Sequence, residues 1–305
     1  MTGIYMDLAL ALALARKDLT VLENGIEFID FSSVFDSRDT SEIIRSQQLL
    51  RRVHQELYCK FFPLENEQES VECWLDLLRS GPVKGQHVYM VFGRNLNSSA
   101  PEIMAFIAAG ITGSSSCGLI EYIIREKKYS SCLNGLTICH LMINRLQELN
   151  FLINRRPLKA ILWEVNNPEK IRYDEQNPDF SIDCMSPRKR CLLLENKYGA
   201  KRIGIDYVQG PLRQCETAEE INRLTCENLL LYLYNAGNYP DFSARDLYQY
   251  VCCFNQATNG HKNPCDLKHN GINKMMNQLR LMMDQNIPVL AEKQTPEQIQ
   301  KLKSC

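Results

Sequence analysis

Three strand-like segments joined by short turns are the feature that most constrains the fold of this chain. They are HVYMVFG (87–93), EIMAFIAAGIT (102–112) and CGLIEYIIR (117–125). Strands that follow one another so closely pair as an antiparallel meander. The amphipathic segment 135–150 and the β-branched and aromatic segment 158–165 come next, and they predict a helix that crosses over to a further strand.

The rest of the chain places further elements on either side of this unit. IEFIDF (26–31) alternates in polarity and predicts a strand. Apolar periodicity and capping residues predict helices at 43–61, 65–81 and 186–199, and a strand follows at 201–208. After Pro211 the pattern predicts helices and no further strand, at 216–235, 243–256 and 266–285. The expected fold class is α/β, built on a mixed sheet.

The change of character along the chain predicts three parts. Residues 1–25 are expected to form a short helix or arm, because the apolar run near the start is brief and is broken by charges. Residues 26–214 form the mixed-sheet domain. Residues 215–305 form a helical C-terminal extension packed on or beside that domain.

The composition excludes several classes of partner. The 305 residues carry a net charge of −1, so no global charge draws the chain to nucleic acid or to an anionic membrane. No segment reaches the roughly 20 apolar residues that cross a bilayer. The thirteen cysteines form no CxxC pair, and the five histidines do not lie at zinc-ligand spacings from them. We therefore expect reduced thiols in the cytoplasm, no metal, and no nucleic-acid or membrane partner.

A candidate phosphate site lies between the strand at 117–125 and the helix that follows it. The residues SSCLNG (130–135) lead directly into that helix. Backbone N–H groups at a helix N-terminus bind anions through their unpaired donors and the helix dipole. The alternative is an ordinary strand–helix turn, in which Gly135 only begins the helix.

Several stretches together resemble the GNAT superfamily of acyl-CoA-dependent N-acyltransferases. The element order matches, and GLIEYIIREKKYSSCLNGLT is similar to that family's fourth strand, pyrophosphate loop and third helix. KRCLLLENKYGAKRIGIDYVQGPL resembles its last helix and closing strand. VHQELYCKFFPLENE, EVNNP, DCMSPRKR and the strand end YVQGP resemble a bacterial subgroup with a helical tail. The resemblance covers residues 26–212 and implies a GNAT-like acyltransferase fold.

The family's pyrophosphate loop reads (Arg or Gln)-x-x-Gly-x-(Gly or Ala), and only its last position matches here. The residues that the resemblance assigns to binding CoA in this loop are Ser130, Ser131, Cys132, Leu133, Asn134 and Gly135. Ser130 replaces the Arg or Gln, and Leu133 replaces the middle Gly. Three features are expected to keep some anion binding: the two serine hydroxyl groups, the tolerance of Asn134 for left-handed backbone, and the charges of Lys127 and Lys128.

The resemblance also places the pantetheine arm of acetyl-CoA along the strand 117–125. Backbone groups of Ile123, Ile124 and Arg125 are then expected to face the arm. Arg125 stands where the family usually has an apolar residue. It is expected either to point outward or to reach a CoA phosphate.

N-acyl transfer needs a base for the proton of the amine and an acid for the departing thiolate. The candidate bases are Glu121 and Glu164, because the family's fourth and fifth strands splay apart and both acids then border one cleft. The alternative for each is a solvated or salt-bridged strand acid. Tyr122 and Tyr207 are candidate hydroxyl groups near the cleft, and the alternative for them is a core tyrosine with one hydrogen-bond partner.

Two further positions are raised by the comparison with the family. Many members place a Tyr in the last helix as the thiolate acid, and the matching residue here is Glu195, with Tyr198 three residues on. Gln209 in the YVQ stretch is expected either to orient the substrate or to hold a strand end.

The resemblance implies an N-acyltransferase that moves an acyl group from acetyl-CoA to an amine by direct attack in a ternary complex. The acceptor is a small-molecule or peptide amine, and the chain acts as a monomer or an oligomer. One alternative is a GNAT-like binding or regulatory protein with a degenerate CoA loop and little or no catalysis. Another is an interaction protein whose helical tail docks a partner.

Overall fold

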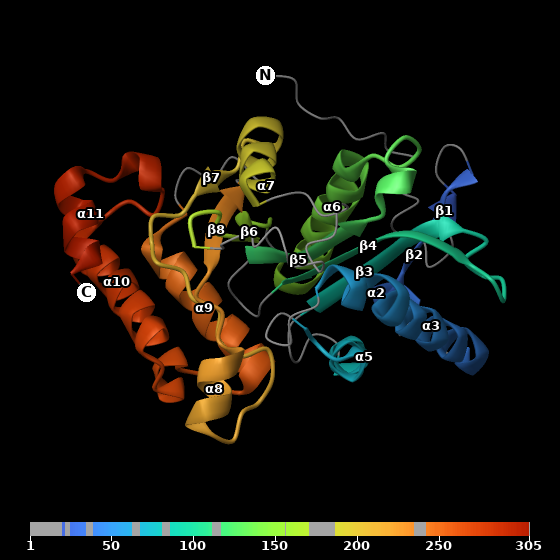
Figure 1. Ribbon diagram of the computed structural model, residues 1–305, viewed down its shortest axis with the longest axis horizontal. Coiled ribbons are helices and arrows are strands. Elements are labelled where there is room, and N and C mark those ends of the chain that lie inside the picture. Colours follow the sequence, from blue (N-terminus) through green and yellow to red (C-terminus); the bar gives the residue numbers. More distant parts are fainter. Residues whose placement is uncertain are drawn as a thin grey trace, which may run out of the picture.

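The computed structural model describes residues 20–21, 25–34, 39–62, 68–80, 86–111, 117–155, 157–170, 187–234 and 242–304. At its centre is a mixed eight-stranded sheet in the order β1-β2-β3-β4-β5-β6-β8-β7 (Figure 1). Neighbouring strands are antiparallel, except that β5 and β6 are parallel. The mixed α/β sheet predicted from the sequence is therefore confirmed.

The predicted meander forms the middle of the sheet. Its strands are β3 (Gln86–Arg94), β4 (Glu102–Ile111) and β5 (Cys117–Arg125). β2 (Glu27–Asp30) pairs with β3 on the outer side, and the short β1 (Thr20–Val21) pairs with β2. After β3 the chain turns at Asn95, whose φ of 52° lies in the left-handed region that asparagine tolerates.

The predicted crossover helix is α6, which spans Gly135–Asn154 and leads back to β6 (Ala160–Asn166). The helix begins at a cap, since the Asn134 side chain accepts a hydrogen bond from the N–H of Leu136. It covers one face of the sheet with a buried stripe that includes Ile138, Met142 and Leu146. A return through a helix gives β6 the same direction as β5.

One strand of the sheet comes from the segment that the sequence assigns to a helix. The prediction for 216–235 is wrong: α8 ends at Leu224 (Ala218–Leu224), and Leu229–Tyr234 forms β8, between β6 and β7. Leu230 and Tyr232 are buried in the core under α6, while Leu231 and Leu233 are buried on the other face. A strand buried on both faces has a continuous apolar sequence, which periodicity cannot distinguish from a buried helix.

The predicted strand at 201–208 is also much shorter than expected. Only Lys201–Arg202 forms β7, and it pairs with β8. Beyond it, isolated bridges join Ile203 to Leu290 and Gln209 to Cys226. The irregular backbone between these bridges carries Tyr207, so this side chain is positioned by contacts with distant segments and not by a strand register.

Helices cover both faces of the sheet (Figure 1). α6 and α7 (Pro187–Leu193) lie on one face, and α7 continues as a π-helical turn (Leu194–Tyr198) that ends at Gly199 with φ 65°. The other face has two separate cores. One lies under α3 (Thr40–Val53) and α5 (Val71–Ser80), and the other under α9 (Ala244–Asn259) and α10 (Asn270–Gln285). The C-terminal part is thus mainly helical, as predicted.

Shorter elements complete the described chain, and side-chain caps fix several helix starts. The short helices are α2 (Phe31–Val34), a π-helical turn (His54–Tyr58), α4 (Cys59–Phe61), α11 (Pro296–Lys303) and 3-10 turns at Lys127–Tyr129, Pro264–Leu267 and Ala291–Lys293. Asp39 caps α3, and Ser243 forms a capping box with Asp246 at the start of α9. These are local signals that the sequence carries directly.

The predicted N-terminal arm lies almost wholly outside the described residues. Of residues 1–25, only Thr20, Val21 and Gly25 are described, and the first two form β1. Most of the polar segment 166–183 is likewise outside them. Among the helices that the structure describes, none is long and apolar enough to cross a membrane.

Candidate active site

The parallel strands β5 and β6 part after four residue pairs. They are paired only from Cys117–Ile120 to Ala160–Trp163. Farther along, β5 pairs only with β4, and β6 pairs only with β8. The edge of β5 that faces β6 therefore presents backbone groups without a strand partner beyond Ile120. This is the parting of strands that the family resemblance implies.

A β-bulge turns Glu121 toward the face that carries α5. The register between β4 and β5 shifts at Ala108 and Ala109, which leaves Glu121 as an extra residue opposite them. Its Oε1 lies 3.8 Å from Nδ1 of the buried His87. Burial lowers the pKa of His87 to about 4, so this ring is neutral at pH 7.

Glu164 on β6 is held by two partners from the irregular segment after β7. It accepts hydrogen bonds from the hydroxyl group of Tyr207 and from Nε2 of Gln209, the latter at 2.6 Å. The bridge between Gln209 and Cys226 fixes the backbone of that segment. Burial raises the pKa of Glu164 to about 7, although the bond from Tyr207 opposes this shift. Two predicted site residues, Glu164 and Tyr207, are thus in direct contact.

A third buried carboxyl group, which the sequence analysis does not single out, belongs to Glu69. Its Oε2 accepts a hydrogen bond of 2.7 Å from Nε1 of Trp74, and burial raises its pKa to about 7. Burial and then the charges of Glu69 and Glu164 raise the pKa of Glu121 well above its ordinary value. We call Glu69, Glu121 and Glu164 the carboxyl cluster. Glu69 stands just before α5, where an acidic residue ordinarily interacts with the helix dipole at the surface. The sequence therefore offers no signal that this side chain is buried.

Aromatic rings line the Glu69 side of the carboxyl cluster. The π-helical turn His54–Tyr58 brings Tyr58 over this region, where its hydroxyl oxygen accepts from the N–H of Glu69 at 3.0 Å. The Tyr58 ring lies 4.7 Å from that of Trp74 and 4.9 Å from that of Tyr122, centroid to centroid. Tyr122, a predicted site residue, therefore belongs to this aromatic packing, whereas Tyr207 contacts Glu164.

The predicted phosphate loop is closed on itself by short-range hydrogen bonds. The N–H groups of Tyr129, Ser130, Cys132 and Leu133 all bond to carbonyl groups at 126–129. Asn134 has φ −80°, so it does not supply the left-handed backbone that was expected of it. Leu133 is only 2% exposed and packs in the core under α6. A residue at this position cannot let the backbone approach a phosphate as glycine does.

Arg125 lies against the loop that follows β5. Its guanidinium donates a hydrogen bond of 2.7 Å to the carbonyl oxygen of Leu133, which ties the end of β5 to the loop. Of the other predicted cofactor residues on β5, Ile123 is 39% exposed, whereas the side chain of Ile124 is buried under α5. Only the backbone of Ile124 is therefore available to a ligand.

Polar and basic side chains remain on the outer surface of the loop. Ser130, Ser131 and Asn134 are exposed, Cys132 is half-buried, and a Cβ built on Gly135 would meet no atom within 4 Å. Lys60, Lys127 and Lys128 line a hollow of about 460 Å³ together with Glu126. Glu126 pairs with Lys60 at 3.2 Å and with Lys128 at 2.8 Å.

Glu195 and Tyr198, the two candidate residues near the end of the last helix of the predicted domain, make their contacts on the face of the sheet that α6 covers. Glu195 accepts a hydrogen bond of 2.9 Å from the hydroxyl group of Tyr232. The Tyr198 ring lies 5.4 Å from that of Trp163, and burial raises its pKa. Gln209, by contrast, contacts the carboxyl cluster, so of these positions it is the one that the structure brings to the site.

Comparisons with known proteins give only distant matches. No family model and no curated protein matches the chain. A GNAT-family acetyltransferase from Staphylococcus aureus matches with TM-score 0.36 and 10% identity, over 70% of this chain and 99% of that one. A probable GNAT-family acetyltransferase from Chromobacterium violaceum gives 0.36 and 9%, over 74% and 95%. The ribosomal-protein-S18-alanine N-acetyltransferase from Escherichia coli gives 0.33 and 10%, over 68% and 97%. Likenesses this low assign neither family nor activity, and the chain's own residues have to carry both.

Proposed function

We propose that this chain belongs with the GNAT-like N-acyltransferases and moves an acyl group from an acyl-CoA, such as acetyl-CoA, to an amine. The observation that carries the proposal is Glu164, which lies where β5 and β6 part and is held by Tyr207 and Gln209. A buried carboxyl group with a pKa of about 7 suits a general base near neutral pH. The antiparallel meander, the crossover helix and the parallel pair support the same assignment.

The residues present fit the two ends of an acyl-CoA unequally. The unpaired edge of β5 at Ile123–Arg125 fits the amide-rich pantetheine arm, because it offers backbone donors and acceptors. The loop offers the pyrophosphate the hydroxyl groups of Ser130 and Ser131 and the start of α6 at Gly135, with Lys127 and Lys128 nearby. We infer that the arm supplies more of the binding free energy than the pyrophosphate does.

The chemistry assigned to the side chains is proton transfer and orientation. An acyl-CoA supplies the thioester, and the attacking amine must lose a proton as its nitrogen bonds to the carbonyl carbon and the carbon–sulfur bond breaks. Glu164 takes that proton, directly or through one water, and the thiolate leaves with a proton from solvent or from a nearby hydroxyl group. Tyr207 and Gln209 hold both carboxylate oxygens, so the base keeps one orientation.

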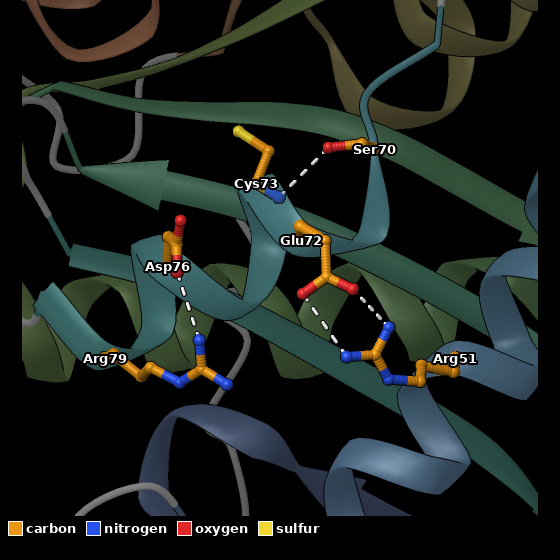
Figure 2. A network of polar contacts seen from close by, with 6 residues as sticks. All are labelled: Arg51, Ser70, Glu72, Cys73, Asp76 and Arg79. Atoms are coloured by element: carbon orange, nitrogen blue, oxygen red, sulfur yellow. Dashed lines mark hydrogen bonds and ion pairs between the residues drawn. The ribbon is translucent and has the colours of Figure 1, made fainter.

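The test is thioester consumption by the full chain with acetyl-CoA and a panel of primary amines. Glu164→Gln keeps the shape of the side chain but removes the base, and we expect turnover to fall about 100-fold or more. The control is Glu72→Gln, since Glu72 is exposed on α5 and bonds to Arg51 on α3 (Figure 2). Full activity of Glu164→Gln, or no amine-dependent consumption by the wild type, contradicts the proposal.

A second candidate function is a GNAT-like binding or regulatory protein without catalysis. It is favoured by the closed loop, in which Leu133 is buried and Arg125 bonds to the loop carbonyl. The two functions differ in one pair of measurements. Acetyl-CoA binding by calorimetry together with no thioester consumption on any amine supports this second function.

The state of the cysteines supports the expected compartment. Cys139 and Cys191 are free thiols within the described residues, and both are buried as small apolar side chains. Reduced thiols persist in the cytoplasm. We accordingly place the proposed activity in that compartment.

A further inference from the structure

The carboxyl cluster is buried without a basic partner. In the described part of the chain, the partners of Glu69, Glu121 and Glu164 are Trp74, the neutral His87, Tyr207 and Gln209, and no Lys or Arg pairs with any of the three acids. Carboxyl groups removed from water without a cation are strongly unfavourable when ionised. Because all three acids lie on one face of the sheet, a positive charge placed among them would stabilise their ionised forms.

Buried polar atoms without a partner surround the same acids. Among the described residues, Nδ1 of His87 and the hydroxyl group of Tyr89 have no hydrogen-bond partner, the Tyr250 hydroxyl group lies beside that of Tyr207, and neither Tyr89 nor Tyr250 has exposed surface. Burial, followed by the charges of Glu69 and Glu121, raises the pKa of Tyr89. Burial, followed by the charges of Glu164 and Glu121, also raises the pKa of Tyr250. Orphaned polar groups of this kind are rare in a folded interior, and a bound water or the polar end of a ligand would satisfy them.

These buried acceptor atoms complement an ammonium group. Neutral imidazole nitrogen and phenolic oxygen both accept hydrogen bonds, and an ammonium group has three N–H donors. Aromatic faces, such as those of Tyr58 and Tyr122, add attraction for an organic cation. Within the described residues, no group of three His, Cys, Asp or Glu side chains is placed to hold a metal ion.

Two functions are separated within the cluster. The amine that is acylated must be neutral, and Glu164 is the acid assigned to take its proton. Glu121, beside His87, and Glu69, beside Trp74, then have no role in proton transfer. The burial of Glu121 and Glu69 still makes their ionised forms unfavourable, and a second positive charge would offset that cost.

We propose that the acceptor is a diamine or polyamine, with one amine directed at Glu164 and a second, protonated amine held by Glu121 and Glu69. This inference rests on the proposed acyl transfer, and it adds the class of acceptor. His87, Tyr89 and Tyr250 accept the remaining N–H groups of the ligand. An acceptor with a single amine leaves Glu121 and Glu69 without a cationic partner. An anionic acceptor is repelled by all three acids.

The test compares three probes of similar length on the full chain: putrescine, butylamine and butanediol. Calorimetry without acetyl-CoA measures binding alone, and turnover with acetyl-CoA is measured in parallel. We expect putrescine to bind at least about tenfold more tightly than butylamine, because one buried charge pair is worth that factor or more. Butanediol, which carries no charge, is expected to bind least.

Glu121→Gln and Glu69→Gln test the role of the second amine. Each is expected to reduce the preference for putrescine over butylamine to about twofold. Glu72→Gln, three residues beyond Glu69 but exposed, should retain the full preference, and thermal unfolding of each variant confirms that it folds. Equal binding of putrescine and butylamine by the wild type, or an unchanged preference in both variants, overturns the inference.

The two proposals fail in different measurements. Selective putrescine binding with no thioester consumption contradicts the proposed acyl transfer but retains the diamine site. Acylation of butylamine as efficient as that of putrescine, with equal binding, retains acyl transfer and overturns the diamine site.

Discussion

One acid of the carboxyl cluster lies on β5 and the loop at 126–135 follows that strand, yet the two regions bond their polar groups in opposite ways. In the loop, the N–H groups of Tyr129, Ser130, Cys132 and Leu133 bond to carbonyl groups three or four residues earlier, and the Leu133 side chain fills the core. In and around the carboxyl cluster, three carboxyl groups and several hydroxyl groups are buried, and some of the polar atoms there have no partner. The loop is therefore a stable local structure, whereas the carboxyl cluster retains unfavourable burial.

This difference in hydrogen bonding supports the site that we propose. Native structures satisfy buried polar groups almost everywhere, and exceptions concentrate at functional sites. On this ground we propose the carboxyl cluster as the place of the chemistry, and we assign the loop a smaller share in binding the ligand.

Leu133→Gly is expected to have the largest effect, and on stability. The side chain is buried in the core under α6, so its removal leaves a cavity and should lower the free energy of unfolding by about 3–5 kcal/mol. Urea unfolding measures this, with the exposed Ser131→Gly as the control, for which a change below about 1 kcal/mol is expected. Tighter acetyl-CoA binding by Leu133→Gly with unchanged stability would show that the loop is a worn phosphate site after all.

The second prediction concerns the pH dependence of stability. Burial raises the pKa of Glu69 to about 7, so between about pH 4.5 and that value the folded chain binds a proton that the unfolded chain has released. The free energy of unfolding should therefore fall as pH rises through this window. In Glu69→Gln this contribution disappears, and the fall should shrink by on the order of 1–3 kcal/mol.

Unfolding at about pH 5 and about pH 8 measures the effect. The control is Glu72→Gln, because Glu72 is exposed and paired with Arg51 (Figure 2). A wild-type chain that becomes more stable as pH rises through this window would contradict the burial of the carboxyl cluster.

The smallest expected effect belongs to Tyr207→Phe. The Tyr207 hydroxyl group opposes the upward pKa shift of Glu164, so its loss should raise that pKa further. Activity near neutral pH should then fall by about tenfold and recover as pH rises, because one unit of pKa is a factor of ten in the fraction of ionised base.

The matched control for Tyr207→Phe is Tyr232→Phe. Tyr232 also donates its hydroxyl hydrogen to a glutamate, Glu195, but on the α6 face of the sheet. Its pH profile should match that of the wild type. A loss of activity in Tyr207→Phe that is the same at every pH would indicate a structural role and not a positioning role.

The sequence predicts those features that depend on neighbours in the chain. The meander, the crossover helix and the end at Gly199 of the π-helical turn after α7 follow from periodicity, short turns and helix-stop residues, and β5 has the predicted bounds. Glu164 and Tyr207 were also named from their stretches and are in contact. What connects them was not visible, because their contact joins segments 43 residues apart.

The features that were missed depend on burial by distant elements. Glu69 has the sequence context of an exposed helix-start acid, and only the packing of Tyr58 and Trp74 makes it a buried one. β8 has an apolar run that fits a buried helix equally well, and its pairing with β6 decides between the two. For Arg125 the sequence leaves two orientations open, outward or toward a CoA phosphate, and the carbonyl oxygen of Leu133, eight residues on, is the acceptor that its guanidinium group meets.

The position of β8 has a consequence for the order in which the protein is made. β6 is synthesised well before β8. Yet β8 is the strand that pairs with β6 from Ile161 to Asn166. Until residue 234 has left the ribosome, the chain carries an apolar strand edge at β6, a template for pairing with another chain. Nascent or truncated forms that end near 214 are therefore expected to recruit chaperones or to aggregate. Low solubility on release would then be a property of their length and not of any damaged residue.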